Sequence, residues 1–320
     1  RDPKNKHIAI VFFGGEPLLN KKLIFKIVKY TNKKCAENNL IPHYSISTNC
    51  TLIHGDKQLI DLIRENNFSL CISIDGPPQI HNVNRPFKNE KGSYREVQKG
   101  INYLHEEKIH RLRARATYVI GNGHLRDIVF HLNKMGFDRV YVEEVSNLTD
   151  KRFSDITNFN YLESEYNKLF SEYKKNILNK KTYAFKVSYF DEILRMIQKG
   201  GVKFYYCGAG RTFLSVSSKG EFYPCHRFVG NEDMKVGNVF TGLNEEKLRE
   251  FINRICVSNR KSCLKCWVRF LCAGGCAYEN FVESGSIDGL DILNCIKRRF
   301  LLRKFILLYS SLPKEIKDNL

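Results

Sequence analysis

The first half of the chain alternates between short apolar runs and longer segments whose apolar residues recur every three or four positions. The runs end in glycine or small polar residues and are typical of buried strands, whereas the spaced pattern is typical of helices. We predict strands at 7–15, 43–49, 69–78, 111–121 and 139–146, and helices at 21–39, 57–67, 94–108 and 125–136.

This alternation of strand and helix continues to about residue 145 and predicts a parallel sheet covered by helices. A loop with small or polar residues follows each predicted strand. In parallel α/β folds, ligands bind at the carboxyl ends of the strands, so these loops are the expected binding site. The first of the five predicted strands lies almost at the start of the sequence, so we expect either a small sheet or a missing upstream part.

The second half has a different character. The segment 158–180 is polar, amphipathic and rich in aromatic residues, and it predicts a bridging helix. The final segment, 296–320, is basic and amphipathic, and it predicts either a packed terminal helix or a helix on a membrane surface. The expected parts of the chain are a sheet domain at 1–150, a bridging segment at 151–204, a cysteine-rich domain at 205–300 and a terminal helix at 301–320.

Composition and charge narrow the class of protein. The 320 residues are 42% hydrophobic and 27% charged, as in ordinary globular proteins. No apolar run approaches the roughly 20 residues of a membrane span, so no membrane partner is expected. The net charge of +18 would suit a polyanion, but no aromatic-rich basic motif accompanies it, so we expect no nucleic-acid partner. No signal peptide is present, so we expect a cytoplasmic location, where clustered cysteines bind metal more often than they form disulfides.

Eight of the eleven cysteines lie between Cys207 and Cys295. Seven of them follow the order Cys-x12-Gly-x4-Cys, a gap, Cys-x2-Cys-x5-Cys-x3-Cys, a second gap and Cys. A zinc ribbon would use two Cys-x2-Cys pairs around one ion, and only one such pair occurs here. Seven thiolates exceed one tetrahedral site and suit iron–sulfur clusters, each held by up to four cysteines. The isolated Cys35, Cys50 and Cys71 are expected to be small buried residues.

The spacing of the seven cysteines resembles the SPASM domain, the auxiliary-cluster domain of many radical S-adenosylmethionine enzymes that modify peptides. The resemblance covers about residues 205–300, and the surrounding sequence is similar to maturases that form thioether crosslinks or act on quinohemoprotein amine dehydrogenase. It implies two auxiliary 4Fe–4S clusters, one closed and one with three protein ligands. The implied ligands are Cys263, Cys266, Cys272 and Cys295 for the closed cluster and Cys207, Cys225 and Cys276 for the other.

Fully ligated members of the family carry a further cysteine shortly before the first one, and this sequence has none there. The resemblance therefore implies one iron that no protein thiolate holds. Such an iron could bind a substrate thiolate, because metal coordination deprotonates and orients a thiol. Cys256 is an alternative fourth ligand, or else an unused small core residue.

The strand ends of the first half resemble the S-adenosylmethionine pocket of the same enzymes. In "FFGGEPLL" the glycines would allow close approach of the cofactor, and the glutamate would offset its ammonium charge. "SISTN" and "SIDGPPQIHNVNR" resemble the next strand ends, and an arginine in "RARAT" would pair with the cofactor's carboxylate. His81 and Arg85 are expected to stabilise a loop or to line a peptide channel. The implied cofactor-binding residues are Gly14, Gly15, Glu16, Ser47, Asn49, Ser73, Asp75 and Arg115.

One part of the family pattern does not occur in the sequence. The Cys-x3-Cys-x2-Cys loop, whose cluster cleaves S-adenosylmethionine, is missing from residues 1–320. We expect truncation upstream of the Gly-Gly-Glu strand, a third cluster in the full-length protein, and no activity from this chain alone. The alternative is a protein that has lost radical chemistry and kept its clusters.

The resemblance implies a partial (βα)6 TIM-like barrel, truncated at the N-terminus, then a small cysteine-rich SPASM domain and a C-terminal helix. The resemblance implies a radical S-adenosylmethionine enzyme that abstracts hydrogen from a ribosomally made precursor peptide and forms a cysteine thioether. The expected electron donor is flavodoxin or ferredoxin. The alternatives are another SPASM maturase, for a sulfatase or a quinohemoprotein, and a non-catalytic cluster-bearing scaffold that binds a peptide.

Overall fold

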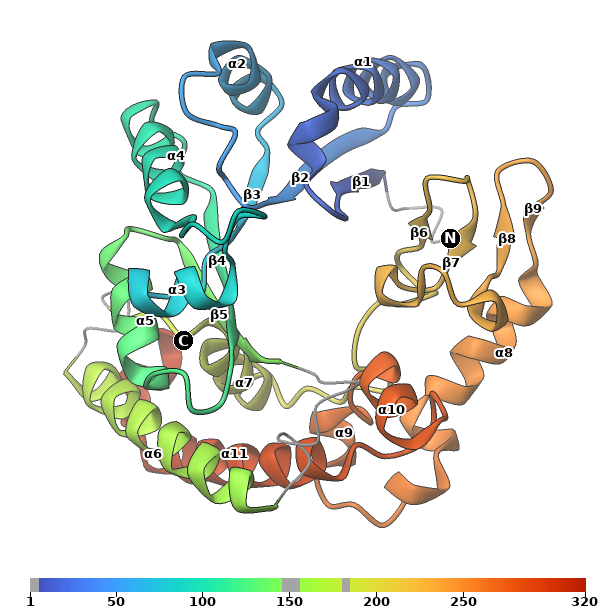
Figure 1. The fold of residues 1–320 in the computed structure, drawn as a ribbon. Helices are drawn as coiled ribbons and strands as arrows, with labels where there is room; N and C mark the ends of the chain where they lie inside the picture. The colour runs from blue at the N-terminus through green and yellow to red at the C-terminus, as the bar shows by residue number, and fades with distance from the viewer. Residues whose placement is uncertain (1–5, 146–155, 180–184) are drawn as a thin grey trace. The chain divides into compact units, whose positions relative to one another are not determined.

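The computed structural model describes residues 6–145, 156–179 and 185–320. A five-stranded parallel sheet has the order β1-β2-β3-β4-β5, so each strand lies beside its neighbour in sequence (Figure 1). The α/β class and the five predicted strands are confirmed. The strands are β1 (His7–Phe12), β2 (Ile41–Thr48), β3 (Ser69–Ser73), β4 (Leu112–Tyr118) and β5 (Arg139–Glu144).

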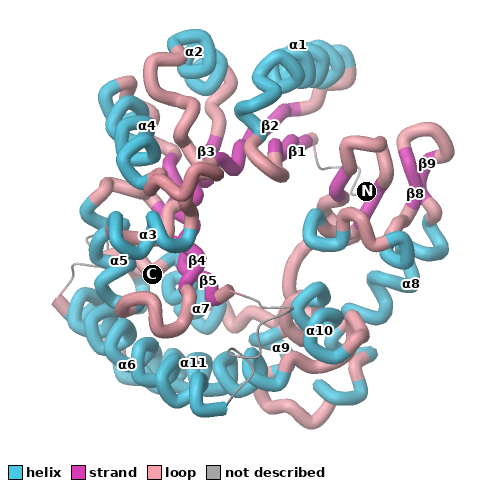
Figure 2. The backbone as a smooth tube through the Cα atoms, viewed as in Figure 1, coloured by secondary structure: helices cyan, strands magenta, loops and turns pink. Residues whose placement is uncertain are grey.

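Helices connect the consecutive strands, as parallel pairing requires. Figures 1 and 2 show them along one side of the sheet. Side chains cap two of these helices: the Asn20 side-chain oxygen accepts a hydrogen bond from the Leu23 amide at 3.3 Å, and the Asp56 carboxylate accepts one from the Leu59 amide at 3.1 Å. The four predicted connecting helices are α1 (Lys21–Glu37), α2 (Lys57–Glu65), α4 (Tyr94–Glu106) and α5 (Leu125–Lys134).

Two short helical segments at the strand ends were not predicted. The 3-10 helix η1 (Pro17–Asn20) follows β1, and helix α3 (Pro78–Asn84) follows β3. Both begin with proline, whose fixed φ suits the first helical position but which reads as a turn signal in the sequence. Both segments follow strand ends at which the candidate site lies.

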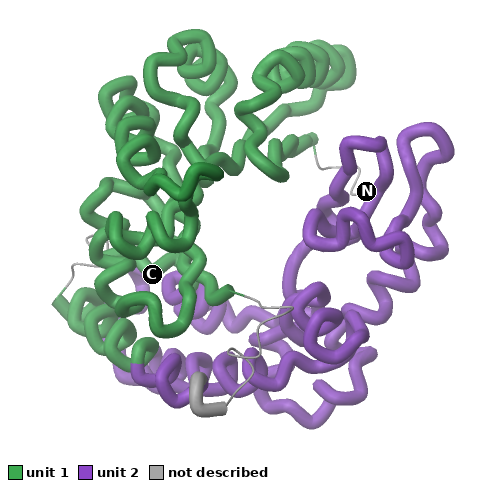
Figure 3. Tube along the Cα trace, in the orientation of Figure 1, with its two compact units in different colours: residues 1–145, 165–189 green, residues 146–164, 190–320 purple. Residues whose placement is uncertain are grey.

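The chain divides into two compact units (Figure 3). Unit 1 comprises residues 1–145 and 165–189, and unit 2 comprises residues 146–164 and 190–320. Helix α6 (Ile156–Leu178) occupies the position of the predicted bridging helix, and α7 (Ser188–Gln198) follows it. Residues 151–155 and 180–184 of the predicted bridging segment lie outside the described residues.

Unit 2 contains short hairpins and helices around a small apolar core. Phe228 lies in this core, and its ring contacts those of Phe251, Tyr278 and Phe281 edge-on. Cys225 is buried in the same core, so one predicted cluster ligand is fixed by side-chain packing. The two hairpins are β6 (Ser215–Val216) with β7 (Phe222–Tyr223) and β8 (Gly237–Asn238) with β9 (Gly242–Leu243), and the helices are α8 (Glu245–Ile255), α9 (Arg269–Cys272), α10 (Ala277–Ser284), α11 (Ile292–Ser311) and α12 (Lys314–Asp318).

The C-terminal helix differs from the one expected at 301–320. Helix α11 begins at Ile292, because the Asp291 carboxylate caps it through the Asn294 amide at 2.8 Å. It ends before Pro313, and α12 follows. Leu301, Leu302, Phe305 and Leu308 of α11 are buried, which fits the packed interpretation of this segment. No helix in the described part of the chain is long and apolar enough to cross a membrane.

Candidate functional site

A cavity of about 310 Å³ lies in unit 1, at the carboxyl ends of β1, β2 and β3. This is the edge of a parallel sheet at which ligands bind. The structure brings five of the eight predicted cofactor-binding residues together in its wall: Gly14, Gly15, Ser47, Asn49 and Ser73. Polar side chains beyond the strand ends complete the lining, among them Thr51, His81 of α3, Arg85 and Ser93.

Gly14 and Gly15 are required by their backbone conformation. Their φ values are 101° and 28°, in the region where a side chain causes strain. No atom lies within 4 Å of the position that a Cβ would occupy at either residue, so crowding is not the reason for glycine. The backbone of this loop therefore remains open to the cavity, as close approach of a ligand requires.

Glu16 supports the cavity from behind instead of lining it. Its carboxylate accepts hydrogen bonds from the Thr48 hydroxyl and the Asn49 amide, both at 2.7 Å, and from the Leu18 amide at 3.1 Å. These bonds tie the end of β2 to the loop after β1. The carboxylate thereby fixes the relative positions of two cavity walls.

Asp75 is also a supporting residue. Its carboxylate is 1% exposed and accepts hydrogen bonds from Arg85 Nε at 2.9 Å and from the Thr117 amide at 2.8 Å. The Asp75 amide donates to His81 Nδ1 at 3.2 Å, and His81 Nε2 lies 3.0 Å from Ser93 Oγ. The Ser93 hydroxyl in turn donates to the Arg85 carbonyl at 2.5 Å. This network holds the Arg85 guanidinium at the cavity wall.

Burial lowers the pKa of His81 to about 4, and the nearby Asp75 carboxylate offsets only part of this effect. Between pH 6.5 and 4 the unfolded chain therefore binds a proton at this residue that the folded chain does not bind. The contribution of His81 to stability is complete above about pH 6.5 and is lost as the pH falls. We expect the free energy of unfolding to fall by up to about 3 kcal/mol across this range for this group.

Chemical denaturation across this pH range checks the prediction. The His81→Gln variant should lose most of the pH dependence that His81 contributes. The exposed His110 provides a matched control, and His110→Gln should keep the wild-type slope. Parallel curves for wild type and His81→Gln would contradict the assignment.

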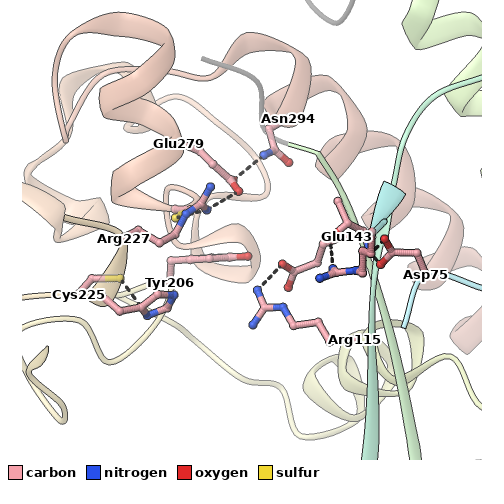
Figure 4. Close-up of polar contacts among 12 residues, drawn as sticks. Asp75, Arg115, Glu143, Tyr206, Cys225, Arg227, Glu279 and Asn294 are labelled. Atoms are coloured by element: carbon pink, nitrogen blue, oxygen red, sulfur yellow. Dashed lines mark hydrogen bonds and ion pairs between the residues drawn. The ribbon is translucent and has the colours of Figure 1, made fainter. Parts of the chain in front are cut away.

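Arg115, the predicted partner of a cofactor carboxylate, does not line the cavity. Its guanidinium forms an ion pair with Glu143 of the neighbouring strand at 2.7 Å, and both side chains are exposed (Figure 4). Arg85 contributes a guanidinium to the cavity wall instead. The sequence shows that Arg85 follows the end of β3, near the expected site. It does not show that the Arg85 side chain lines the cavity, because the buried Asp75 carboxylate sets the direction of that side chain.

In unit 2, the four cysteines predicted for the closed cluster lie near one another. Cys263 interacts electrostatically with Cys266 and Cys272, and Cys295 interacts with Cys263 and Cys272. Burial, followed by these neighbouring thiols, raises the pKa of Cys295 to about 11. These four cysteines come from the 3-10 helix η6 (Lys261–Cys263), α9, the loop between them and α11.

A buried guanidinium adjoins these cysteines. Arg260 is 3% exposed, and its two terminal nitrogens donate to the carbonyls of Gly274 and Gly289. Its Nε is buried and has no hydrogen-bond partner in the described structure. The Arg260 charge also lowers the pKa of Cys263, although burial raises it more. A buried cation requires a compensating anion, and a cluster held by four thiolates carries negative charge.

The three remaining predicted ligands are positioned by different elements. Cys225 interacts electrostatically with Cys207, and its sulfur also accepts a backbone hydrogen bond from Arg227. Cys276 precedes α10, and its sulfur accepts backbone hydrogen bonds from Tyr278 and Glu279. Burial raises the pKa of Cys276 to about 11. A helix N-terminus favours an anionic sulfur at this position.

The donor set fits iron–sulfur clusters. All eleven cysteines are free thiols, so none of the seven is used in a disulfide. Among the described residues, no three His, Cys, Asp or Glu side chains are placed to hold a single metal ion. A 4Fe–4S cube distributes its thiolates over four irons, so its ligands lie farther apart than those of one ion.

Residues 3–135, which span β1 to α5, match the Radical SAM superfamily. This part of the chain is a radical S-adenosylmethionine domain. Enzymes of this superfamily use a 4Fe–4S cluster and S-adenosylmethionine. The chain is also homologous to the "Cysteine-type anaerobic sulfatase-maturating enzyme" of Clostridium perfringens (strain ATCC 13124). The two are 29% identical over 294 residues, which are 85% of this chain and 74% of the relative.

Two further comparisons extend this relationship. The "Radical SAM cyclopropyl synthase TigE" of Paramaledivibacter caminithermalis is 25% identical over 311 residues, which are 94% of this chain and 61% of that protein. The solved structure "Native anSMEcpe with bound AdoMet and Kp18Cys peptide" matches the fold with a TM-score of 0.78 at 22% identity. The match covers 97% of this chain and 88% of that one. It confirms the fold class and a partial barrel.

Proposed function

We propose that the protein is a peptide maturase that forms a cysteine thioether crosslink in a ribosomally made precursor peptide. The observation that carries this proposal is the grouping of the cysteines in unit 2. Cys263, Cys266, Cys272 and Cys295 lie near one another, Cys207 lies near Cys225, and Arg227 links Cys225 to Cys276; the sequence has no further cysteine shortly before Cys207. In this proposal residues 205–300 are a SPASM domain with two auxiliary 4Fe–4S clusters.

The residues of unit 1 would bind and orient S-adenosylmethionine. The open backbone at Gly14 and Gly15 would receive its methionine part, and Ser47, Asn49 and Ser73 would contact its polar groups. Arg85 is better placed than Arg115 to pair with a carboxylate in the cavity, because it lines the wall and Asp75 fixes its direction. With a reduced cluster, the cofactor supplies a radical that abstracts hydrogen from a peptide carbon.

In the same proposal, Cys207, Cys225 and Cys276 would hold a cluster that could bind a thiolate from the peptide. Buried sulfurs and backbone donors at α10 would keep this position fixed. The reaction would join the thiol sulfur to the carbon: the carbon would lose a hydrogen atom to the radical, the thiol would lose its proton, and the electron released as the bond forms would pass to the closed auxiliary cluster. An electron donor such as flavodoxin or ferredoxin would supply the reducing equivalents.

Co-expression tests this proposal. The natural gene product, including any sequence outside residues 1–320, is produced together with a small cysteine-rich peptide encoded beside it. We expect a loss of two hydrogens per crosslink in the mass of the peptide, and no loss with Cys225→Ala. The control variant Cys35→Ala changes a buried cysteine of α1 and should keep the modification. An unchanged peptide mass that accompanies peptide binding would favour the scaffold alternative.

A second candidate function is sulfatase maturation. The relationship to the Clostridium perfringens enzyme favours it, because that protein is named a cysteine-type sulfatase-maturating enzyme. A synthetic sulfatase peptide that contains its target cysteine distinguishes the two candidates. If the enzyme modifies the sulfatase peptide and leaves the precursor peptide encoded beside its gene unchanged, sulfatase maturation replaces thioether formation as the proposed function.

A further inference from the structure

The Arg227 side chain lies beside two of the cysteines proposed for the three-cysteine cluster. Its Nη1 donates to the sulfur of Cys276 at 3.7 Å. Its positive charge also acts on Cys225, whose sulfur accepts a hydrogen bond from the Arg227 backbone. One residue therefore contacts two sulfurs that come from different segments of unit 2.

A carboxylate holds this guanidinium in place. Arg227 Nη1 also donates to Glu279 Oε1 at 2.9 Å, and the two side chains are largely buried, at 26% and 21% exposure (Figure 4). The guanidinium stacks over the Tyr278 ring at 4.3 Å, which limits its rotation. Glu279 Oε2 accepts a hydrogen bond from Asn294 Nδ2 at 2.9 Å. A guanidinium that is fixed on three sides cannot move away when the charge of its neighbour changes.

The residue after Asn294 is Cys295, a proposed ligand of the closed cluster. The chain of contacts Cys276–Arg227–Glu279–Asn294 therefore begins at one proposed cluster and ends beside the other. In this series of contacts, the Arg227 guanidinium lies beside Cys276, and the Glu279 carboxylate lies between Arg227 and Asn294. Both charges act on Cys276, so we expect each to affect the three-cysteine site most strongly.

The reduction potential of an iron–sulfur cluster depends on its net charge and on the hydrogen bonds to its sulfurs. Reduction adds one negative charge. A nearby cation and an N–H···S hydrogen bond stabilise the reduced form more than the oxidised form, so both raise the potential. A nearby carboxylate has the opposite effect.

We propose that Arg227 is a positioning residue that raises the reduction potential of the three-cysteine cluster, and that Glu279 both holds it and offsets part of its charge. This inference rests on the proposed function, because it requires a cluster on Cys207, Cys225 and Cys276. It adds a residue pair that sets how readily that cluster accepts an electron.

A redox titration of the anaerobically reconstituted protein, followed by electron paramagnetic resonance, tests the inference. Arg227→Gln removes the cation and should shift the potential of one cluster to a more negative value. Glu279→Gln removes the offsetting charge and should shift the potential of the same cluster to a more positive value. Arg254→Gln is the matched control, because Arg254 also pairs with a carboxylate, Asp288 at 2.8 Å, and both side chains are 39% exposed. It should leave both potentials unchanged.

The iron content separates the possible failures. If both variants keep the wild-type iron content and the wild-type potentials, the inference on Arg227 is overturned and the proposed clusters remain. If wild-type protein binds no iron after reconstitution, the proposed function and the inference are both overturned. If the Arg227→Gln variant loses one cluster, the inference is tested by the redox titration of Glu279→Gln alone. A more negative potential of the three-cysteine cluster in Glu279→Gln would then overturn the inference.

Discussion

Replacing Cys266 with alanine should remove about four irons per chain, because one 4Fe–4S cluster loses a ligand and does not assemble. Any alanine substitution at Cys263, Cys272 or Cys295 should have the same effect, since these thiols gather with Cys266 in one set. The measurement is iron and acid-labile sulfide per chain after anaerobic reconstitution.

Combining substitutions tests whether there are two independent sites. Cys266→Ala together with Cys225→Ala should remove all the iron, whereas Cys266→Ala together with Cys272→Ala should remove no more than either single change. Cys256→Ala is the control, because this residue lies outside both proposed sets and should keep the wild-type iron content. A loss of iron in Cys256→Ala would instead make Cys256 a ligand and close the open position.

Replacing Asp75 with alanine should lower the free energy of unfolding by about 3 kcal/mol. The change leaves the Thr117 amide without its acceptor and the Arg85 guanidinium without its counterion in a largely buried site. Urea denaturation followed by circular dichroism, under anaerobic conditions, measures the shift in the midpoint.

The matched control is another arginine–carboxylate pair of the same sheet. Arg115 and Glu143 are 45% and 59% exposed, so Glu143→Ala should change the free energy of unfolding by less than about 1 kcal/mol. Equal effects of Asp75→Ala and Glu143→Ala would contradict the assignment of Asp75 as a supporting residue of the cavity.

The sheet and its four long helices could be predicted because buried strands leave short apolar runs in the sequence and helices that bury one face leave apolar residues every three or four positions. The elements that escaped prediction, η1 and α3, are too short to show such a period and begin with proline. The strand-end residues Gly14, Ser47 and Ser73 could be placed together, since parallel strands present their carboxyl ends at one edge.

Side-chain direction could not be predicted in the same way. Glu16 and Asp75 were expected to face the cofactor, yet protein donors occupy both carboxylates behind the cavity wall. In unit 2, the family resemblance grouped Cys263 with Cys295, which local periodicity could not do; the two residues lie near each other, and their role as ligands stays a prediction. The sequence contains one indication that Arg227 lies near a cluster, because it follows the predicted ligand Cys225 by two residues. Its contact with Cys276 could not be predicted, because it depends on the fold.

The most direct test of the account is the metal content of the wild-type chain. After anaerobic purification and reconstitution, the account predicts about eight irons and eight sulfides per chain, four of each per 4Fe–4S cluster, with a brown colour. Mössbauer spectroscopy should show one iron site without four-sulfur coordination, and an added thiol should change its signal. A chain that contains zinc and no iron would contradict the account, because its cysteines would then form structural zinc sites.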